Sequence, residues 1–141
     1  MAISIDFVQR SFGGKKFRPS TQVSYDKASQ LLLCITPWGQ EDIVEKIQDS
    51  VISFLSRSME DEDLTIPFAK KQNLHDRGND LRSAVILSSE QIYKEFNGEE
   101  YNCGFEIFAA INDENQWTYV SCGQPSAILC RPPLGLLPYT H

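Results

Sequence analysis

Apolar and polar residues alternate in the first third of the chain, with the period of two that a half-buried strand shows. Residues 3–9 (ISIDFVQ) follow this alternation from Ile3 to Phe7 and predict a first strand. Residues 21–26 (TQVSYD) predict a second strand, and residues 30–36 (QLLLCIT) predict a third. The third segment is almost continuously apolar, as strands buried on both faces are. We therefore expect it to lie in the centre of a sheet.

The pattern changes its period after the third strand. Apolar residues recur at steps of three and four from Ile43 to Leu55, with charged residues between them. This spacing predicts one amphipathic helix. The next segment, 58–79, is polar and contains Pro67 and Gly78, both of which interrupt helices. We expect a long loop there.

A second helix and a second group of strands are predicted in the remainder. Asn79 or Asp80 is the expected N-cap of this helix, and Asn97-Gly98 is its expected end. Beyond it the alternation returns, and three strands are expected at residues 103–112, 117–122 and 126–131. Gly135 is expected to close the series.

This order of elements defines an α+β fold class. Three strands, two adjacent helices and at least three further strands suit antiparallel sheets with both helices packed on one side. Adjacent helices depart from the βαβ alternation of a doubly wound sheet, so we expect no nucleotide site at a switch point between parallel strands. The chain has neither GxGxxG nor a GxxxxGKS or GxxxxGKT loop. Its 141 residues suit a single domain, 1–141.

Charge and cysteine content limit which classes of partner and which cellular compartment we expect for the chain. The chain has 13 basic and 19 acidic side chains, a net charge of −6, which repels phosphate backbones and anionic lipid. We therefore expect no nucleic-acid partner. We also expect no membrane partner, because no apolar run approaches the roughly 20 residues that cross a bilayer. The four cysteines form no CxxC pair, which argues against zinc and favours free thiols in a cytoplasmic protein.

Few residues are arranged for chemistry. His75 and His141 belong to no HExxH or paired-cysteine pattern, and no serine lies in GxSxG. The acidic run 60–63 could hold a hard cation, but it lacks the interior glycine and terminal glutamate of an EF-hand loop. We expect no catalytic residue, no metal ligand and no cofactor. Trp38 is either a core residue or an exposed anchor for a partner, and the sequence leaves both open.

The junction at residues 34–40 (CITPWGQ) resembles part of a known family. In metal-dependent protein phosphatases of the 2C type, a strand ends in a Val-Ala-Asp-Gly-Met-Gly-Gly elbow before the first long helix. Thr36 stands where that family has a metal-binding aspartate, and Pro37 stands where it has a glycine. Upstream, RPSTQV resembles the family's Arg-x-x-Asn-Glu-Asp, with Arg18 kept and Val23 in place of the other N-terminal metal aspartate.

Later segments continue the resemblance. Residues 88–97 are similar to the family's Ala-Asn-x-x-Ile-Tyr helix, and residues 117–131 are similar to its strand, Gly-Asp-Ser-Arg turn and strand. In that turn Gly123 is kept and Gln124 replaces the aspartate. The final LPYTH resembles Leu-Thr-x-Asp-His and keeps only His141. The resemblance spans nearly the whole chain and implies about half of the family's α-β-β-α sandwich.

The resemblance implies a phosphatase-like module without activity. In the family, carboxylates hold two divalent cations, and the water that bridges them attacks phosphorus. Thr36 and Val23 supply no anionic oxygen for such ions. We therefore predict a pseudophosphatase, not an enzyme, that acts through a protein partner or as a homodimer joined by the C-terminal strands.

Two alternatives stay open at this point. The chain could be a divalent-metal-dependent phosphohydrolase that uses other acids, such as Glu41, Asp42 or Glu106. It could also be a structural or assembly domain that is similar to the phosphatases only in architecture.

Overall fold

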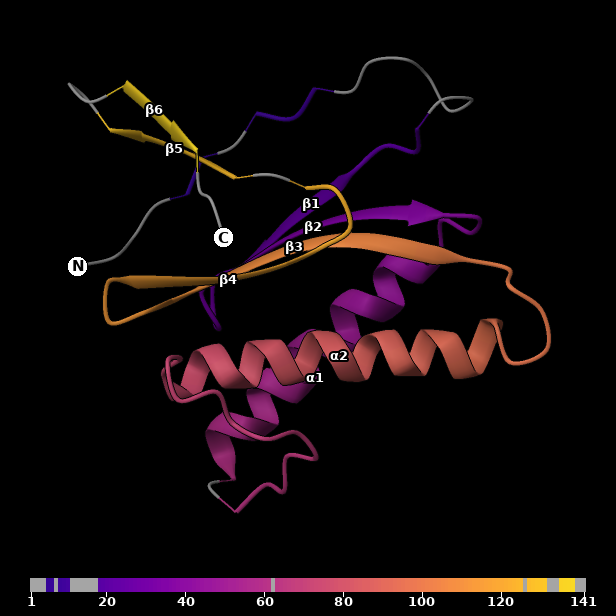
Figure 1. Cartoon of the computed structure of the whole chain (residues 1–141), viewed down its shortest axis with the longest axis horizontal. Coiled ribbons are helices and arrows are strands. Elements are labelled where there is room, and N and C mark those ends of the chain that lie inside the picture. Colours follow the sequence, from indigo (N-terminus) through magenta and orange to yellow (C-terminus); the bar gives the residue numbers. More distant parts are fainter. Residues whose placement is uncertain are drawn as a thin grey trace.

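A computed structural model describes residues 5–6, 8–10, 18–61, 63–125, 127–131 and 135–138. In chain order the elements are β1 (Gln22–Asp26), β2 (Leu31–Trp38), α1 (Ile43–Glu60), α2 (Asp76–Phe96), β3 (Gly104–Asp113), β4 (Gln116–Cys122), β5 (Ile128–Arg131) and β6 (Gly135–Pro138). β1 to β4 form one antiparallel sheet in chain order, and β5 and β6 form a separate antiparallel pair. Both helices lie on one side of the four-stranded sheet, and the β5–β6 hairpin lies on the other side (Figure 1). The expected α+β class, with two adjacent helices on one side, is confirmed.

β2 is the central strand that the sequence predicts, and it runs further than predicted. It pairs with β1 over residues 31–35 and with β3 over residues 31–38. Pro37 falls in the extension, although proline cannot donate to a ladder of hydrogen bonds. It is tolerated because β1 does not reach this far, so that only β3 pairs with β2 at Pro37.

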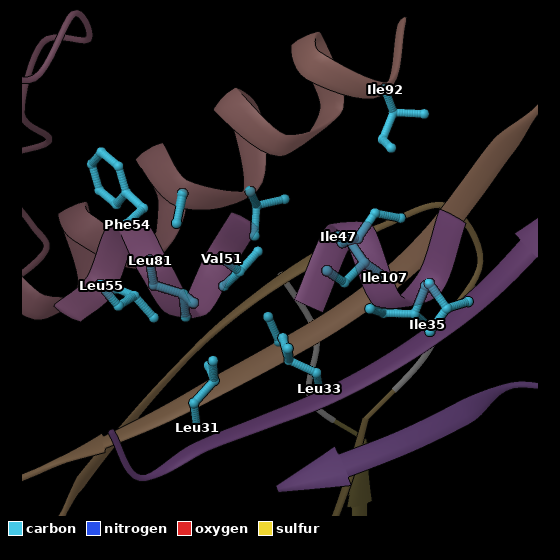
Figure 2. Close-up of a cluster of buried hydrophobic side chains, with 14 of the residues drawn as sticks. Leu31, Leu33, Ile35, Ile47, Val51, Phe54, Leu55, Leu81, Ile92 and Ile107 are labelled. Atoms are coloured by element: carbon cyan, nitrogen blue, oxygen red, sulfur yellow. The ribbon is translucent and has the colours of Figure 1, made fainter. Parts of the chain in front are cut away.

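The core lies between the sheet and the two helices. Leu31, Leu33 and Ile35 of β2 point toward α1 and α2, and each is at most 1% exposed (Figure 2). The other strands and the helices add the remaining buried apolar side chains, chiefly Ile107, Ala109, Ile111, Ile43, Val44, Ile47, Val51, Phe54, Leu55, Leu81, Ala84, Val85 and Ile92. The apolar residues that alternate along the strands and those that recur every three or four positions in α1 thus form one buried cluster.

α2 starts earlier than predicted. It begins at Asp76, so Asn79 and Asp80 lie within its first turns and neither is its cap. The N-cap is His75, whose Nδ1 accepts a hydrogen bond from the N–H of Gly78 at 3.3 Å. The loop expected at 58–79 is therefore wrong at both ends, because α1 also continues to residue 60.

Tertiary contacts explain why Gly78 and Asn79 lie inside a helix. A Cβ on Gly78 would lie 2.9 Å from Cγ2 of Thr118, so glycine lets α2 pack closely on β4. The Asn79 side chain accepts from the N–H of Lys71 at 2.8 Å and donates to the carbonyl of Leu74 at 3.1 Å. Gly78 thus lets α2 pack on β4, and Asn79 fixes the α1–α2 loop, although both residue types usually break or cap helices.

The ends of the chain differ from the prediction as well. The strand expected at 3–9 falls partly outside the described residues, and its described positions, 5–6 and 8–9, are not in a strand. The strand expected at 126–131 corresponds to β5, which starts slightly later. Gly135, expected to close the series, instead begins β6, which pairs with β5.

Leu33→Ala should lower the free energy of unfolding by about 2–5 kcal/mol, because it leaves a cavity beneath the helices. Urea denaturation followed by circular dichroism measures this change. Met59→Ala, at a side chain of α1 that is 61% exposed, is the control. It should change the free energy of unfolding by less than about 0.5 kcal/mol. Equal losses in both variants would contradict the position of the core.

Candidate functional site

The sheet face opposite the helices brings together the end of β2, the start of β3 and the residue that follows β4. Thr36 of β2 is the register partner of Glu106 of β3. Gly123, directly after β4, lies beside Glu106, because a Cβ on Gly123 would be 2.8 Å from the Cβ of Glu106. Gly123 has a φ of +94°, a conformation that favours glycine. One row of residues from three neighbouring segments therefore crosses this end of the sheet.

An ion pair joins Arg18 to Glu106 in this row. Nη2 of Arg18 donates to Oε2 of Glu106, although the two residues are 88 positions apart in the sequence. The Glu106 side chain is 16% exposed and the Arg18 side chain 43% exposed. A partly exposed pair of this kind contributes about 1 kcal/mol or less to stability. The pair also matters for the charge of the site, because the guanidinium of Arg18 neutralises the carboxylate next to Thr36.

A hydrogen bond between two hydroxyls holds Thr36. Its Oγ1 lies 2.7 Å from Oγ1 of Thr21, and either hydroxyl can donate. Thr36 is buried, at 3% exposed, so this bond spares it the roughly 1–3 kcal/mol that an unpaired buried polar group costs. We call Arg18, Thr21, Thr36, Glu106 and Gly123 the sheet-end cluster.

The structure brings only some of the predicted site residues together. Arg18 and Thr36 belong to the sheet-end cluster, and Gln124 follows it in the chain as an exposed residue. Val23 pairs with Cys34, which places it one row away from Thr36 along the sheet.

The two residues after Thr36 differ in exposure. Pro37 is buried in β2 as the register partner of Phe105. Trp38, at the end of the same strand, is 38% exposed. Of the two roles left open for Trp38, the exposed position favours the anchor. His141 lies outside the described residues.

The sequence did not indicate Thr21 as a member of the sheet-end cluster, and it did not distinguish Glu106 from other acidic residues. Thr21, rather than Val23, faces Thr36, because β1 and β2 pair in that register. Glu106 is only one of several acids considered from the sequence. The signal for its position is the alternation of β3: Ile107 is buried beneath the helices, so Glu106 points to the opposite face.

The acids considered as alternative ligands occupy different surroundings. Glu41 and Asp42 precede α1, and Asp42 is its N-cap without a side-chain capping bond. Glu106 is paired with Arg18 on the sheet. Among the residues that the structure describes, no three His, Cys, Asp or Glu side chains form a group that could hold a metal ion.

A cavity beside the α1–α2 loop is a second candidate. Its volume is about 530 Å³, and its lining combines apolar, acidic and basic side chains: Ser58, Asp61, Leu64, Ile66, Phe68, Lys70, Asp76 and Asp80. Burial raises the pKa of the Asp80 carboxyl, and a hydrogen bond to Ser58 and the charge of Arg77 oppose this effect only in part. Lys70 forms an ion pair with Asp76 at 2.9 Å. The lysine therefore balances part of the acidic lining, and burial makes the charged form of Asp80 less favourable.

Comparisons of the chain with protein-family models, with curated proteins and with solved structures found no match. No described helix is both long and apolar enough to cross a membrane. The geometry of the described residues is therefore the basis for the functional argument.

Asp80→Asn should remove one component of the pH dependence of stability. Folding raises the pKa of the Asp80 carboxyl, so the folded state keeps this proton to a higher pH than the unfolded state does. In the unfolded state the pKa of an aspartate is about 3.9. Its contribution to stability is therefore complete below about pH 4 and is lost as the pH rises through the folded pKa. The expected result is that Asp80→Asn gains stability relative to the wild type between pH 4 and 7, as urea denaturation measures across that range.

The control for this experiment is Glu90→Gln, at an exposed position on α2. Its free energy of unfolding should stay within about 0.5 kcal/mol of the wild type, because substitutions at exposed positions have little effect on stability. An Asp80→Asn curve that runs parallel to the wild type across the pH range would contradict the burial of Asp80.

Proposed function

We propose that the chain is a catalytically inactive module, similar to the N-terminal half of a phosphatase 2C domain, that acts by binding a protein partner or a second copy of itself. One observation carries this proposal: the polar groups of the sheet-end cluster are bonded to one another. Arg18 pairs with Glu106, and Thr21 pairs with Thr36. The cluster therefore resembles a cross-link within the sheet more than an open site for ions.

The chemistry of metal-dependent phosphate hydrolysis supports this view. Two divalent cations in one site need several anionic oxygens, which carboxylates supply. The cluster contains one carboxylate, Glu106, and that carboxylate already has a guanidinium partner. The hydroxyls of Thr21 and Thr36 are neutral and 2.7 Å apart. A cation entering here would have to displace Arg18 and break the hydroxyl pair.

Exposed aromatic side chains support the binding role. Trp38 is 38% exposed and Trp117 is 41% exposed, and tryptophan is a residue type enriched among the strongest contributors to protein interfaces. The proposal includes a cytoplasmic setting, which the free thiols of Cys34, Cys103 and Cys122 support.

A divalent-metal-dependent phosphohydrolase is the second candidate. The observation that favours it is the position of Glu106, which brings a carboxylate beside Thr36. Thr36 is the residue that, by the resemblance, stands where the family has a metal-binding aspartate. In this candidate Glu106 exchanges Arg18 for a cation, with further ligands from acids elsewhere in the chain. Loss of the ion pair between Arg18 and Glu106 on addition of metal would support this second candidate.

Thr36→Asp alone should restore no hydrolysis of an aryl phosphate in the presence of manganese. One new carboxylate supplies a single ligand where the reaction uses a shared set around two ions. The release of the aryl alcoholate, followed by absorbance, measures the rate. Thr36→Asn has the same shape without the charge and is the matched control. A higher rate for Thr36→Asp than for Thr36→Asn would contradict the proposal.

Manganese titration of the wild-type protein by calorimetry, with an aryl-phosphate assay in parallel, tests the two candidates directly. Absence of both heat and turnover would support the binding module. Heat together with turnover, both lost in Glu106→Gln, would replace it with the phosphohydrolase.

A further inference from the structure

The cavity beside the α1–α2 loop lies where the end of α1, the start of α2 and the segment between them meet. We call it the loop cavity. Figure 1 shows this segment at the end of the helix layer, away from the β5–β6 hairpin. The cavity has a volume of about 530 Å³, and pockets for small organic molecules commonly have volumes of about 300–1,000 Å³. It is therefore large enough for a whole small molecule.

One wall of the loop cavity is apolar. Leu64, Ile66 and Phe68 line it, and each of them remains partly exposed. Thr65 and Pro67, which lie between them in the chain, are exposed, so alternate side chains of this segment line the cavity, as in an extended chain. Leu64 and Ile66 also pack against the hydrophobic core, which holds the wall in place. The apolar surface that the core leaves uncovered is available to the hydrocarbon part of a ligand.

The rest of the lining carries three carboxyl groups and one ammonium group. Asp61 is the C-cap of α1, Asp76 is the first residue of α2, and Asp80 follows one turn later. Lys70 supplies the ammonium group and pairs with Asp76 at 2.9 Å. Oδ1 of Asp61 accepts a hydrogen bond from the N–H of Asp63 at 3.0 Å. Carboxyl groups therefore outnumber the cation within the cavity.

The Asp80 carboxyl has acceptor capacity for a further donor. Asp80 is 9% exposed and forms a hydrogen bond with the Ser58 hydroxyl. That hydroxyl has a single proton, which it also directs to the carbonyl of Leu55 at 2.9 Å. The guanidinium of Arg77, whose charge acts on Asp80, donates to the same carbonyl at 3.4 Å. Because a carboxylate offers about four acceptor positions, Asp80 can accept a hydrogen bond from a group inside the cavity.

We infer that the loop cavity binds a small organic cation, with its ammonium group at Asp80 and its hydrocarbon body against the apolar wall. An anion of the same shape would meet the carboxyl groups and be repelled. A divalent metal ion needs several anionic oxygens, and among the described residues no three His, Cys, Asp or Glu side chains are grouped to hold one. An ammonium group needs only one carboxylate for a charge-assisted hydrogen bond.

This inference goes beyond the proposed function. The loop cavity lies beside the helices and shares no residue with the sheet-end cluster. An organic cation at Asp80 and a protein partner elsewhere on the surface are therefore separate findings, and either can fail without the other.

Titration of the protein with 2-phenylethylamine, followed by nuclear magnetic resonance of the backbone amides at pH 7, tests the site. This probe joins an ammonium group to an aromatic ring through two carbons. Its addition should give saturating shifts that are largest at residues 64, 66, 68 and 80. Shifts that do not saturate, or that are largest outside the loop cavity, would overturn the inference.

Two matched probes test the chemistry of the ligand. 3-Phenylpropionate has the same ring and two-carbon chain but ends in a carboxylate, and it should give no saturating shift at these residues. Nα-acetyl-lysine N-methylamide presents the side chain of a protein lysine, without a ring, and should bind at least about tenfold more weakly than 2-phenylethylamine. Binding of 3-phenylpropionate as strong as that of the amine would overturn the role of the carboxyl groups. Equal or tighter binding of the blocked lysine would overturn the small molecule as the ligand.

Variants locate the two parts of the site. Asp80→Asn keeps the shape of the side chain and removes its charge, so it should raise the dissociation constant for 2-phenylethylamine at least about tenfold. Glu90→Gln removes one negative charge from an exposed position of the same helix and should change it by less than about twofold. Phe68→Ala reduces the apolar wall and should raise it at least about threefold. Circular dichroism checks that each variant is folded. Equal effects of Asp80→Asn and Glu90→Gln, or no effect of Phe68→Ala, would overturn the inferred site.

Discussion

Burial of β2 between two strands and beneath two helices is the constraint on which the rest of the structure depends. Leu31 and Leu33 must face the helices, so the intervening residues of β2 must face the other side. That parity places Thr36 beside Glu106 and away from the core. A shift of one residue would exchange the two faces of β2, so that Leu31 and Leu33 would leave the core and Thr36 would face the helices. The composition of the sheet-end cluster is therefore set by the packing of the core.

Periodicity along the chain was enough to predict the layers, because a strand or helix with one apolar face repeats that face locally. Local signals failed where a distant contact decides the role of a residue. Gly78 looks like a helix breaker but accommodates Thr118, and His75 caps α2 although histidine is a weak cap signal. The same limit applies to the site. The position of Thr36 follows from the end of a strand, whereas its contact with Thr21 depends on a register between strands that no single segment encodes.

The two margins of the candidate surface have opposite chemical character. At the sheet end, ionic and hydroxyl groups find partners within the chain, through Arg18 with Glu106 and Thr21 with Thr36. On the same face of the sheet, Trp117 of β4 is 41% exposed, and Tyr119 stacks on Phe108. The proposed inactivity and the proposed binding role thus rest on two parts of one surface.

The separation of the β5–β6 hairpin from the main sheet has a consequence for how the protein opens. The chain leaves the sheet at Gly123, where a positive φ reverses its course past Glu106. Beyond that point the described strands pair with each other and not with β1 to β4. Parts of a protein that share few backbone hydrogen bonds unfold as separate cooperative units. Opening of the β5–β6 pair therefore breaks none of the ladder hydrogen bonds that join β1 to β4, so the two backbone networks can open independently of each other.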